Sequence, residues 1–277
     1  KTEPNAIATT IELVEGLVAK SQNCWPSVSF DFGEINNILN KFLPAGFYYK
    51  TFMWPKSFWH KIYEPIIRKA AGLGIAPLKP DPDRYEHKFE YCDILVVGSG
   101  PSGLASALAA AKNGAKVILA EDKPRFGGSL LTGEVTIGNK KGKEWADEII
   151  LQLQSMPNVI VKNRSQVFGY YDHNMMVMLE RTKDHIEKPA KFTPRQRLWY
   201  IRAKEVIIST GSIERPLVFG NNDRPGIMLA SAAKEYMRVY GVLVGKKPII
   251  FTNNDSAYET AIDFKKNGID PLIVDVR

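Results

Sequence analysis

Three glycines and one glutamate have the spacing of a dinucleotide-binding site. Residues 93–103 read DILVVGSGPSG, in which Gly98, Gly100 and Gly103 form a G-x-G-x-x-G pattern. Glu121 follows about 20 residues later, as the pattern requires. The first glycine permits a tight turn, the second lets the backbone approach a pyrophosphate, and the third lets a helix pack closely on a strand. An acid at the Glu121 position accepts hydrogen bonds from ribose hydroxyls and repels a 2′-phosphate, so NADP is disfavoured.

The elements that must position these residues are predicted around them. The apolar run 94–97 predicts a buried parallel strand, and the Ala-rich stretch after Gly103 predicts a helix that ends at Gly114. A second strand follows, with Glu121 at its end. The N-terminus of the helix offers free N–H groups to the phosphates. This context makes the motif specific, and a degenerate fold that binds nothing is the weaker alternative. The motif does not distinguish FAD from NAD, because both contain ADP.

Downstream segments are predicted to complete the site. The glycine pair of RFGGSLL (125–131) lets the backbone curl toward the nucleotide, and its serine offers a hydroxyl; an ordinary loop is the alternative. Residues 203–216 predict a strand that brings Thr210 near the pyrophosphate, and Val167 is placed beside the adenine. The candidate cofactor-binding residues are Gly98, Gly100, Ser102, Gly103, Glu121, Asp122, Lys123, Gly128, Ser129, Val167, Thr210 and Gly211.

The segments between these residues have other patterns. Residues 158–172 and 175–182 alternate well enough to predict antiparallel strands. Residues 183–197 contain prolines and many charges, and this composition predicts a solvated loop.

A second dinucleotide unit is predicted near residue 248, without its glycines. PIIFTNNDSAY (248–258) reads as a strand, a polar turn and the start of a helix, and PLIVDVR (271–277) reads as a second strand. Side chains at 253–256 stand where a pyrophosphate needs bare backbone. We therefore expect this degenerate fold to bind no dinucleotide and to be retained for packing. Asp275 ends its second strand and is expected to be inert.

Composition narrows the class of protein. The 277 residues carry a net charge of +7 that is spread along the chain, so a nucleic-acid partner is disfavoured. Two cysteines lie far apart and outside any CxxC motif, which is typical of reduced thiols in a cytoplasmic protein. No apolar run is long enough to span a membrane, and we expect no signal peptide. Both ends are expected to have been cut from something longer.

No catalytic or metal-binding residue is predicted. Motifs such as G-x-S-x-G and HExxH are absent, and no side chain is marked as a nucleophile or general base. Four histidines lack metal-ligand spacing: His60, His87, His173 and His185. Nine aromatic residues between 42 and 63 are expected to pack against the nucleotide domain or a partner subunit, with a stacking platform for single-stranded nucleic acid as the alternative.

The order of these motifs resembles the α subunit of heterotetrameric bacterial sarcosine oxidases. The motifs are GSGPSG, ED, FGGSLL, STGSIERP, FGNNDRPGIMLA and FTNNDSAYETA. The upstream stretches TEPNAIATTIELVEG, FLPAGFYYKTFMWPKSFWHKIYEPIIRKAAGLG and PDPDRYEHKF strengthen the resemblance, which covers essentially the whole chain. Related α subunits of opine and amino-acid dehydrogenases match less well.

The resemblance implies an α/β fold of the two-domain flavoprotein type, with FAD/NAD(P)-binding Rossmann folds of which the second is degenerate. It implies a tail of a ferredoxin-like domain plus linker at 1–90, a dinucleotide-binding domain at 91–243, and the start of the second fold at 244–277. NAD would be held tightly without redox turnover. FAD and sarcosine would lie on the β subunit and FMN near the α–β interface, with γ and δ subunits completing the oxidase. A C-terminal domain that binds tetrahydrofolate would be absent.

Two other functions remain open at this point. The chain could be an independent FAD-dependent oxidoreductase of an amine or opine, which would make it yellow. It could also be an assembly scaffold that binds no nucleotide. The degenerate second fold and the lack of redox cysteines and catalytic residues favour the oxidase subunit, and we expect the chain to be inactive alone.

Overall fold

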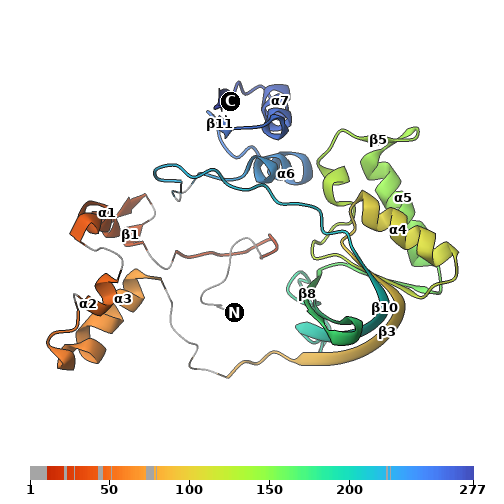
Figure 1. Cartoon of the computed structure of the whole chain (residues 1–277), viewed down its shortest axis with the longest axis horizontal. Coiled ribbons are helices and arrows are strands. Elements are labelled where there is room, and N and C mark those ends of the chain that lie inside the picture. Colours follow the sequence, from red (N-terminus) through yellow and green to blue (C-terminus); the bar gives the residue numbers. More distant parts are fainter. Residues whose placement is uncertain are drawn as a thin grey trace. The chain divides into compact units, whose positions relative to one another are not determined.

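The computed structural model describes residues 11–21, 24–27, 29–42, 46–50, 52–72, 78, 80–222, 224 and 226–277. The chain divides into two compact units, Lys1–Asp83 and Arg84–Arg277 (Figure 1). The expected domain limit at residue 90 falls inside a strand, β3 (Tyr85–Val97). This strand begins so early because it pairs along its length with an equally long partner, β10 (Gln196–Ile208).

The first unit consists of short elements. These are β1 (Pro26–Ser27), β2 (Phe30–Asp31), α1 (Ile35–Leu39), α2 (Phe47–Lys50) and α3 (Glu64–Ala70). Several of the aromatic residues contact one another within this unit: the ring of Phe52 lies 6.0 Å from that of Phe47 and 5.3 Å from that of Tyr63. The Tyr63 hydroxyl donates to the carbonyl of Trp54 at 3.0 Å. The side chains of Phe42, Tyr48 and Tyr49 lie outside the described residues.

A six-stranded sheet forms the centre of the second unit. Its strands lie in the order β7 (Val159–Lys162), β4 (Val117–Ala120), β3, β10, β9 (Met175–Arg181) and β8 (Ser165–Tyr171). The first four strands are parallel, and β9 pairs antiparallel with both β10 and β8. The antiparallel prediction was therefore right for β8 and β9 but wrong for β7, which joins the parallel group because its apolar residues pack beside those of β4.

The sheet curls strongly. Its two edge strands, β7 and β8, are consecutive in the sequence and are separated only by Asn163 and Arg164. Figure 1 shows β8 curled round opposite β3 and β10. The curl is held at its corner by the amide of Ser165, which donates to the carbonyl of Glu121 at 2.7 Å. The start of β8 is thereby brought to the end of β4, where Glu121 lies.

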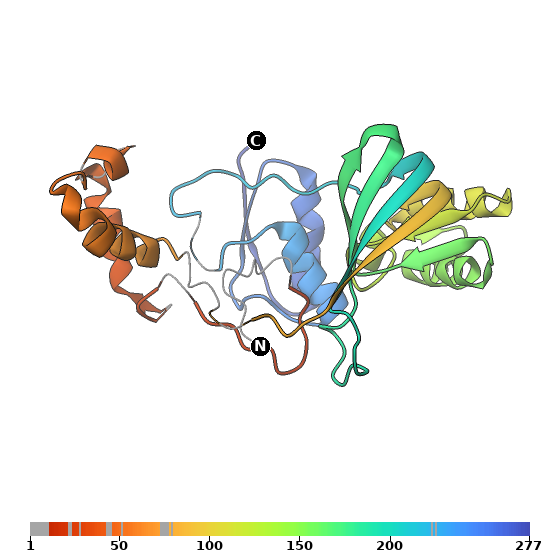
Figure 2. The ribbon, with the colours of Figure 1, turned by 90° about the horizontal axis from the view of Figure 1, so that it is seen from below.

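Two helices cover the parallel strands (Figure 2). Helix α4 (Pro101–Lys112) begins after Gly100 with a proline in its first turn, and it ends before Gly114, whose φ is +84°. Helix α5 (Gly142–Ser155) begins after the short hairpin of β5 (Thr136–Ile137) and β6 (Lys140–Lys141). Apolar side chains from both helices and from β3 and β4 form a buried core: Val96, Leu104, Ala107, Ala111, Val117, Leu119, Leu130, Ala146, Ile149, Ile150 and Leu153.

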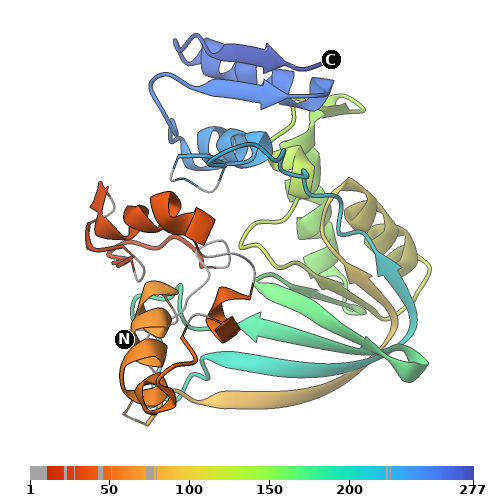
Figure 3. The same ribbon diagram turned by 60° about the vertical axis from the view of Figure 1, so that its left-hand side comes forward.

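The last part of the chain forms a smaller lobe with its own sheet. It contains α6 (Ala230–Tyr240), β11 (Ile249–Thr252), α7 (Tyr258–Lys266) and β12 (Leu272–Asp275). Strands β11 and β12 are parallel and lie side by side, with α7 against them (Figure 3). Its core is built from Ala233, Ile250, Ala257, Ala261 and Phe264. The predicted strand–turn–helix–strand unit is present, and 230–277 is called the second lobe below.

Other predictions have mixed outcomes. The glycine-turn strand, the helix ending near Gly114 and the strand before Glu121 are confirmed. The loop predicted for 183–197 ends two residues earlier, because β10 begins at Gln196 to continue its pairing with β3. No helix in the described part of the chain is long and apolar enough to cross a membrane.

Candidate functional site

Two of the three fingerprint glycines are required by the packing of the protein itself. Gly98 has a φ of +97°, and a Cβ atom there would lie 2.4 Å from the carbonyl oxygen of Ser209, at the end of β10. A Cβ on Gly103 would lie 2.0 Å from the carbonyl oxygen of Gly98, where α4 crosses the strand. Both distances are far below contact distance, so a side chain at either position would push the turn apart.

Gly100 differs from both, because the protein around it would accept a side chain. Its φ is −66°, and no atom of the described residues lies within 4 Å of where its Cβ would be. The space in front of Gly100 is therefore open, as a pyrophosphate approaching the backbone requires. Gly128 borders this space: its φ is +52°, and a Cβ there would lie 2.9 Å from the Cα of Gly100.

The N-terminus of α4 faces the same turn. Gly100 is its N-cap residue and, among the described residues, no side chain accepts a hydrogen bond from its first amides. Ser102, in the first turn, is exposed. Uncapped amides and the positive end of the helix dipole attract an anion, so this end of α4 fits the phosphates of a dinucleotide.

Glu121 is held in a fixed orientation at the end of β4. Its side chain is 7% exposed. Its Oε2 accepts from the amide of Ser99 at 2.9 Å and from the Ser99 hydroxyl at 2.5 Å, and its Oε1 accepts from the amide of Lys123 at 3.0 Å. A carboxylate has about four acceptor positions, so one remains for a ribose hydroxyl. Burial, with a contribution from Asp122, raises the pKa of the Glu121 carboxyl above its ordinary value.

Ser99 was not predicted from the sequence. It is fully buried between the fingerprint glycines, and its backbone oxygen accepts from the amide of Gly127 at 3.0 Å. Ser99 thus joins Glu121, the glycine turn and the RFGGSLL segment. The only sequence signal was a small polar residue inside G-x-G, which does not reveal its partner 22 positions away.

The two residues after Glu121 are placed differently from one another. Asp122 is exposed, and its carbonyl accepts from the Arg181 side chain at 2.5 Å. The ammonium of Lys123 pairs with the carboxylate of Glu235 on α6, at 2.8 and 2.9 Å. Glu235 was also missed, since nothing in the sequence connects α6 with this turn.

The remaining candidates surround the glycine turn and Glu121. Thr210 follows β10, and its Cα would lie 3.3 Å from a Cβ on Gly98. Gly211 comes next with a φ of +70°, and Ser129 is exposed in the 3₁₀ turn Gly128–Leu131. Val167 lies on β8, two residues after the hydrogen bond that joins this strand to Glu121. The contacts of these residues with a nucleotide remain predictions.

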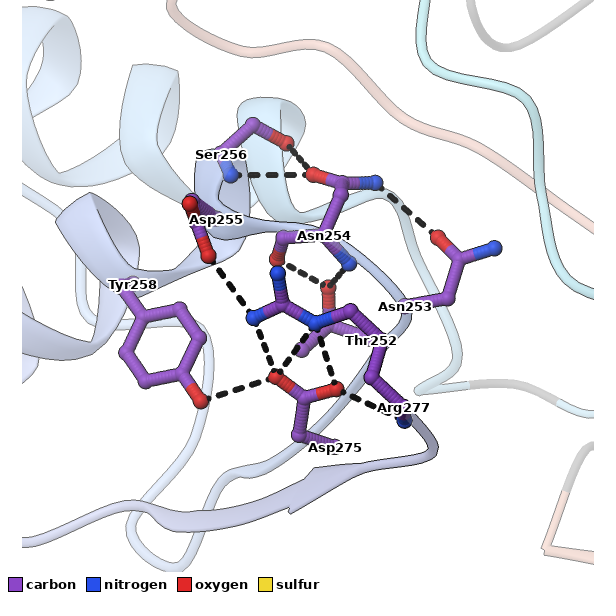
Figure 4. A network of polar contacts seen from close by, with 8 residues as sticks. All are labelled: Thr252, Asn253, Asn254, Asp255, Ser256, Tyr258, Asp275 and Arg277. Atoms are coloured by element: carbon purple, nitrogen blue, oxygen red, sulfur yellow. Dashed lines mark hydrogen bonds and ion pairs between the residues drawn. The ribbon is translucent and has the colours of Figure 1, made fainter.

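In the corresponding turn of the second lobe, polar side chains form a network of contacts with one another (Figure 4). The side-chain oxygen of Asn254 accepts from the amide of Ser256 at 2.9 Å and from its hydroxyl at 2.6 Å. Asp275 accepts from the Tyr258 hydroxyl at 2.9 Å and from the Arg277 guanidinium at 2.7 Å. Arg277 holds the pKa of Asp275 well below its ordinary value. These contacts pair the polar side chains of this turn with one another, and the absence of a dinucleotide here stays a prediction.

Among the described residues, no group of three or more His, Cys, Asp or Glu side chains could hold a metal ion. Cys92 is buried, and burial raises the pKa of its thiol to about 12, which disfavours the reactive thiolate form.

Several known proteins are similar in sequence to this chain. The profile of the family described as FAD dependent oxidoreductase matches residues 93–179. The chain is 50% identical over its whole length to the sarcosine oxidase subunit alpha of Rhizobium meliloti (strain 1021). The chain is homologous to part of the sarcosine oxidase α subunit. The chain spans 28% of the length of the Rhizobium protein. The resemblance inferred from the motifs is confirmed.

Two further comparisons agree. The sarcosine oxidase subunit alpha of Corynebacterium sp. (strain P-1) is 40% identical over 209 residues, which are 74% of this chain and 22% of that protein. The crystal structure of L-proline dehydrogenase from P. horikoshii superposes with a TM-score of 0.56 at 24% identity, covering 69% of this chain and 36% of that one. The structural likeness shows the fold alone. Together with the fingerprint geometry, these findings support a flavin or nucleotide cofactor.

Proposed function

We propose that this chain is the dinucleotide-binding part of a sarcosine oxidase α subunit and that its first fold holds NAD. One observation supports a dinucleotide as the class of ligand. The ordered carboxylate of Glu121 lies at the end of β4, beside a glycine turn whose Gly100 faces open space. A carboxylate beside an open glycine turn suits the ribose and the pyrophosphate of an ADP moiety.

Each residue has a proposed role in holding the nucleotide. Glu121 accepts a hydrogen bond from the adenosine ribose, and the amides near Gly100 and Ser102 bind the pyrophosphate. Gly128 and Thr210 line the turn, and Val167 lies beside the adenine. A bound NAD would supply only binding energy and rigidity here, because we expect the second lobe to bind no dinucleotide that would exchange electrons with it.

The chemistry is proposed to lie elsewhere in a heterotetrameric, cytoplasmic enzyme. FAD and sarcosine belong to a β subunit, FMN to the α–β interface, and γ and δ subunits complete the assembly. Sarcosine is oxidised to glycine, the one-carbon unit passes to tetrahydrofolate on a separate domain, and electrons pass to oxygen. The 50% identity with a sarcosine oxidase α subunit supports this assignment.

The decisive experiment is to denature the purified chain and identify the released nucleotide by absorbance and mass. Release of colourless NAD in about equimolar amount is the expected result. Release of FAD would overturn the choice of NAD. A preparation that contains no nucleotide and binds none when NAD is added would favour the scaffold interpretation.

An independent FAD-dependent oxidoreductase of an amine or opine is the second candidate. The match of residues 93–179 to the FAD dependent oxidoreductase family favours it. A yellow protein with a flavin spectrum would support this function, and the search for a substrate pocket on the chain would then begin at the first fold.

A further inference from the structure

A lysine side chain begins directly beside the carboxylate proposed to bind ribose. The backbone amide of Lys123 donates to Oε1 of Glu121 at 3.0 Å, so the two residues share one tight turn. A lysine ammonium is a mobile point charge that binds phosphate well. From this position Lys123 could reach a phosphate on the adenosine ribose if its ammonium were free.

Its ammonium is not free, because α6 of the second lobe occupies it. Both carboxylate oxygens of Glu235 accept from Nζ of Lys123, at 2.9 and 2.8 Å. The next cation of the turn, Arg125, also points to α6, and its Nη1 donates to the carbonyl of Val239 at 3.4 Å. Helix α6 therefore draws both cations that follow Glu121 toward the second lobe.

The position of Glu235 is itself fixed by the second lobe. Arg238, one turn further along α6, donates from Nε to the buried carboxylate of Asp263 on α7 at 2.6 Å. Lys234 pairs with Glu259 of α7. Glu235 is thus presented to the nucleotide turn by a helix that is anchored on its other side.

We propose that Glu235 is a specificity determinant of the nucleotide site, because it holds Lys123 away from the adenosine ribose and so excludes ligands with a 2′-phosphate. This inference rests on the proposed dinucleotide site. Glu121 alone repels a 2′-phosphate, but a free lysine in the same turn would offset that repulsion. The ion pair with Glu235 neutralises the Lys123 ammonium, so the repulsion between Glu121 and a 2′-phosphate is no longer offset. The second lobe, which we expect to bind no dinucleotide of its own, thereby sets the ligand choice of the first fold.

The test compares two small ligands, ADP and adenosine 2′,5′-bisphosphate, by calorimetric titration of the whole 277-residue chain after removal of bound nucleotide. The variants are Glu235→Gln, Lys123→Gln and the double variant. Glu259→Gln is the matched control, because it removes the same charge from an ion pair of α6 with α7 instead. The readout is the ratio of the two dissociation constants, which cancels any general loss of affinity.

The original chain is expected to bind ADP and to bind the bisphosphate much more weakly. Glu235→Gln should shift the ratio toward the bisphosphate by about fivefold, the size of one exposed charge contact. Glu259→Gln should leave the ratio unchanged, and the double variant should return it to the original value. An unchanged ratio in Glu235→Gln, or a shift that survives in the double variant, would overturn the inference. Failure of the original chain to bind ADP would instead overturn the proposed dinucleotide site.

Discussion

At the scale of single residues, the fingerprint glycines serve two different purposes. Gly98 and Gly103 have no room for a side chain, because the protein's own backbone lies within 2.4 and 2.0 Å of where the Cβ would be. Gly100 has room for a side chain, since no atom of the described residues lies within 4 Å of where its Cβ would be. The structure therefore separates two glycines that the fold requires from one that it does not, and we infer that Gly100 is kept for a ligand.

This separation predicts opposite phenotypes for two alanine substitutions. Gly100→Ala should leave the free energy of unfolding almost unchanged, because the backbone conformation is ordinary and the new methyl group meets no atom. It should weaken nucleotide binding at least about tenfold, because the methyl group occupies the approach of the pyrophosphate. Calorimetric titration with NAD and urea denaturation measure the two effects.

Gly103→Ala is the counterpart and should destabilise the fold by about 3 kcal/mol, or prevent folding, because its methyl group overlaps the carbonyl of Gly98. If Gly100→Ala bound NAD as tightly as the original chain, the open space would not be the pyrophosphate site.

At the scale of elements, the turns that follow the first strand of each fold differ in their capping. The first amides of α4 receive no side-chain cap from the described residues, whereas Asn254 caps the 3₁₀ turn Asp255–Ala257 that precedes α7. An uncapped terminus is favourable for an anion, and a capped one has already satisfied its donors. The first fold and the second lobe share a strand–turn–helix–strand order, and we infer that this difference in capping separates a ligand site from a structural turn.

The contact between α6 and α7 includes a buried ion pair. Arg238 binds Asp263 with two nitrogen atoms, and the Asp263 side chain is 5% exposed. Arg238→Met should destabilise the second lobe by about 3 kcal/mol, because it leaves a buried carboxylate without its partner. Hydrogen exchange of amides in α7 and β12 measures the loss locally.

A matched control is Asp270→Asn, which breaks the exposed pair between Lys265 and Asp270. This change should leave exchange unaltered, because ion pairs in full contact with water contribute little. Equal effects of the two substitutions would contradict a special role for the buried pair.

At the scale of the whole molecule, the described residues of the chain include a proposed nucleotide site, and no catalytic group has been identified among them. The chain also spans 28% of its Rhizobium relative. The described part of the first fold presents neither a metal cluster nor a reactive thiol.

The isolated chain is therefore expected to show no oxygen uptake with sarcosine, even when it is saturated with NAD. An oxygen-electrode assay checks this, with a complete heterotetrameric sarcosine oxidase as the positive control. Sarcosine-dependent uptake by the purified chain alone would contradict the proposed division of labour among subunits.

The sequence by itself determined the local features of the site. The glycine spacing, the Ala-rich helix and the acid after the second strand identified the first fold, because each of them reflects a constraint within about 30 neighbouring residues. The missing glycines at 253–256 identified the altered second turn in the same way, and the extended set of motifs identified the relatives.

Only the tertiary structure decided which distant residues meet. The curl of the sheet, whose edge strands are β7 and β8, and the early start of β3 depend on strands that come from separate segments. The hydrogen bond from Ser99 to Glu121 and the ion pair of Lys123 with Glu235 also join separate segments. Side-chain type and periodicity encode what a segment buries, but they do not encode its partner. The partner depends on how the sheet curls and where the second lobe packs, and these follow from the packing of the chain as a whole.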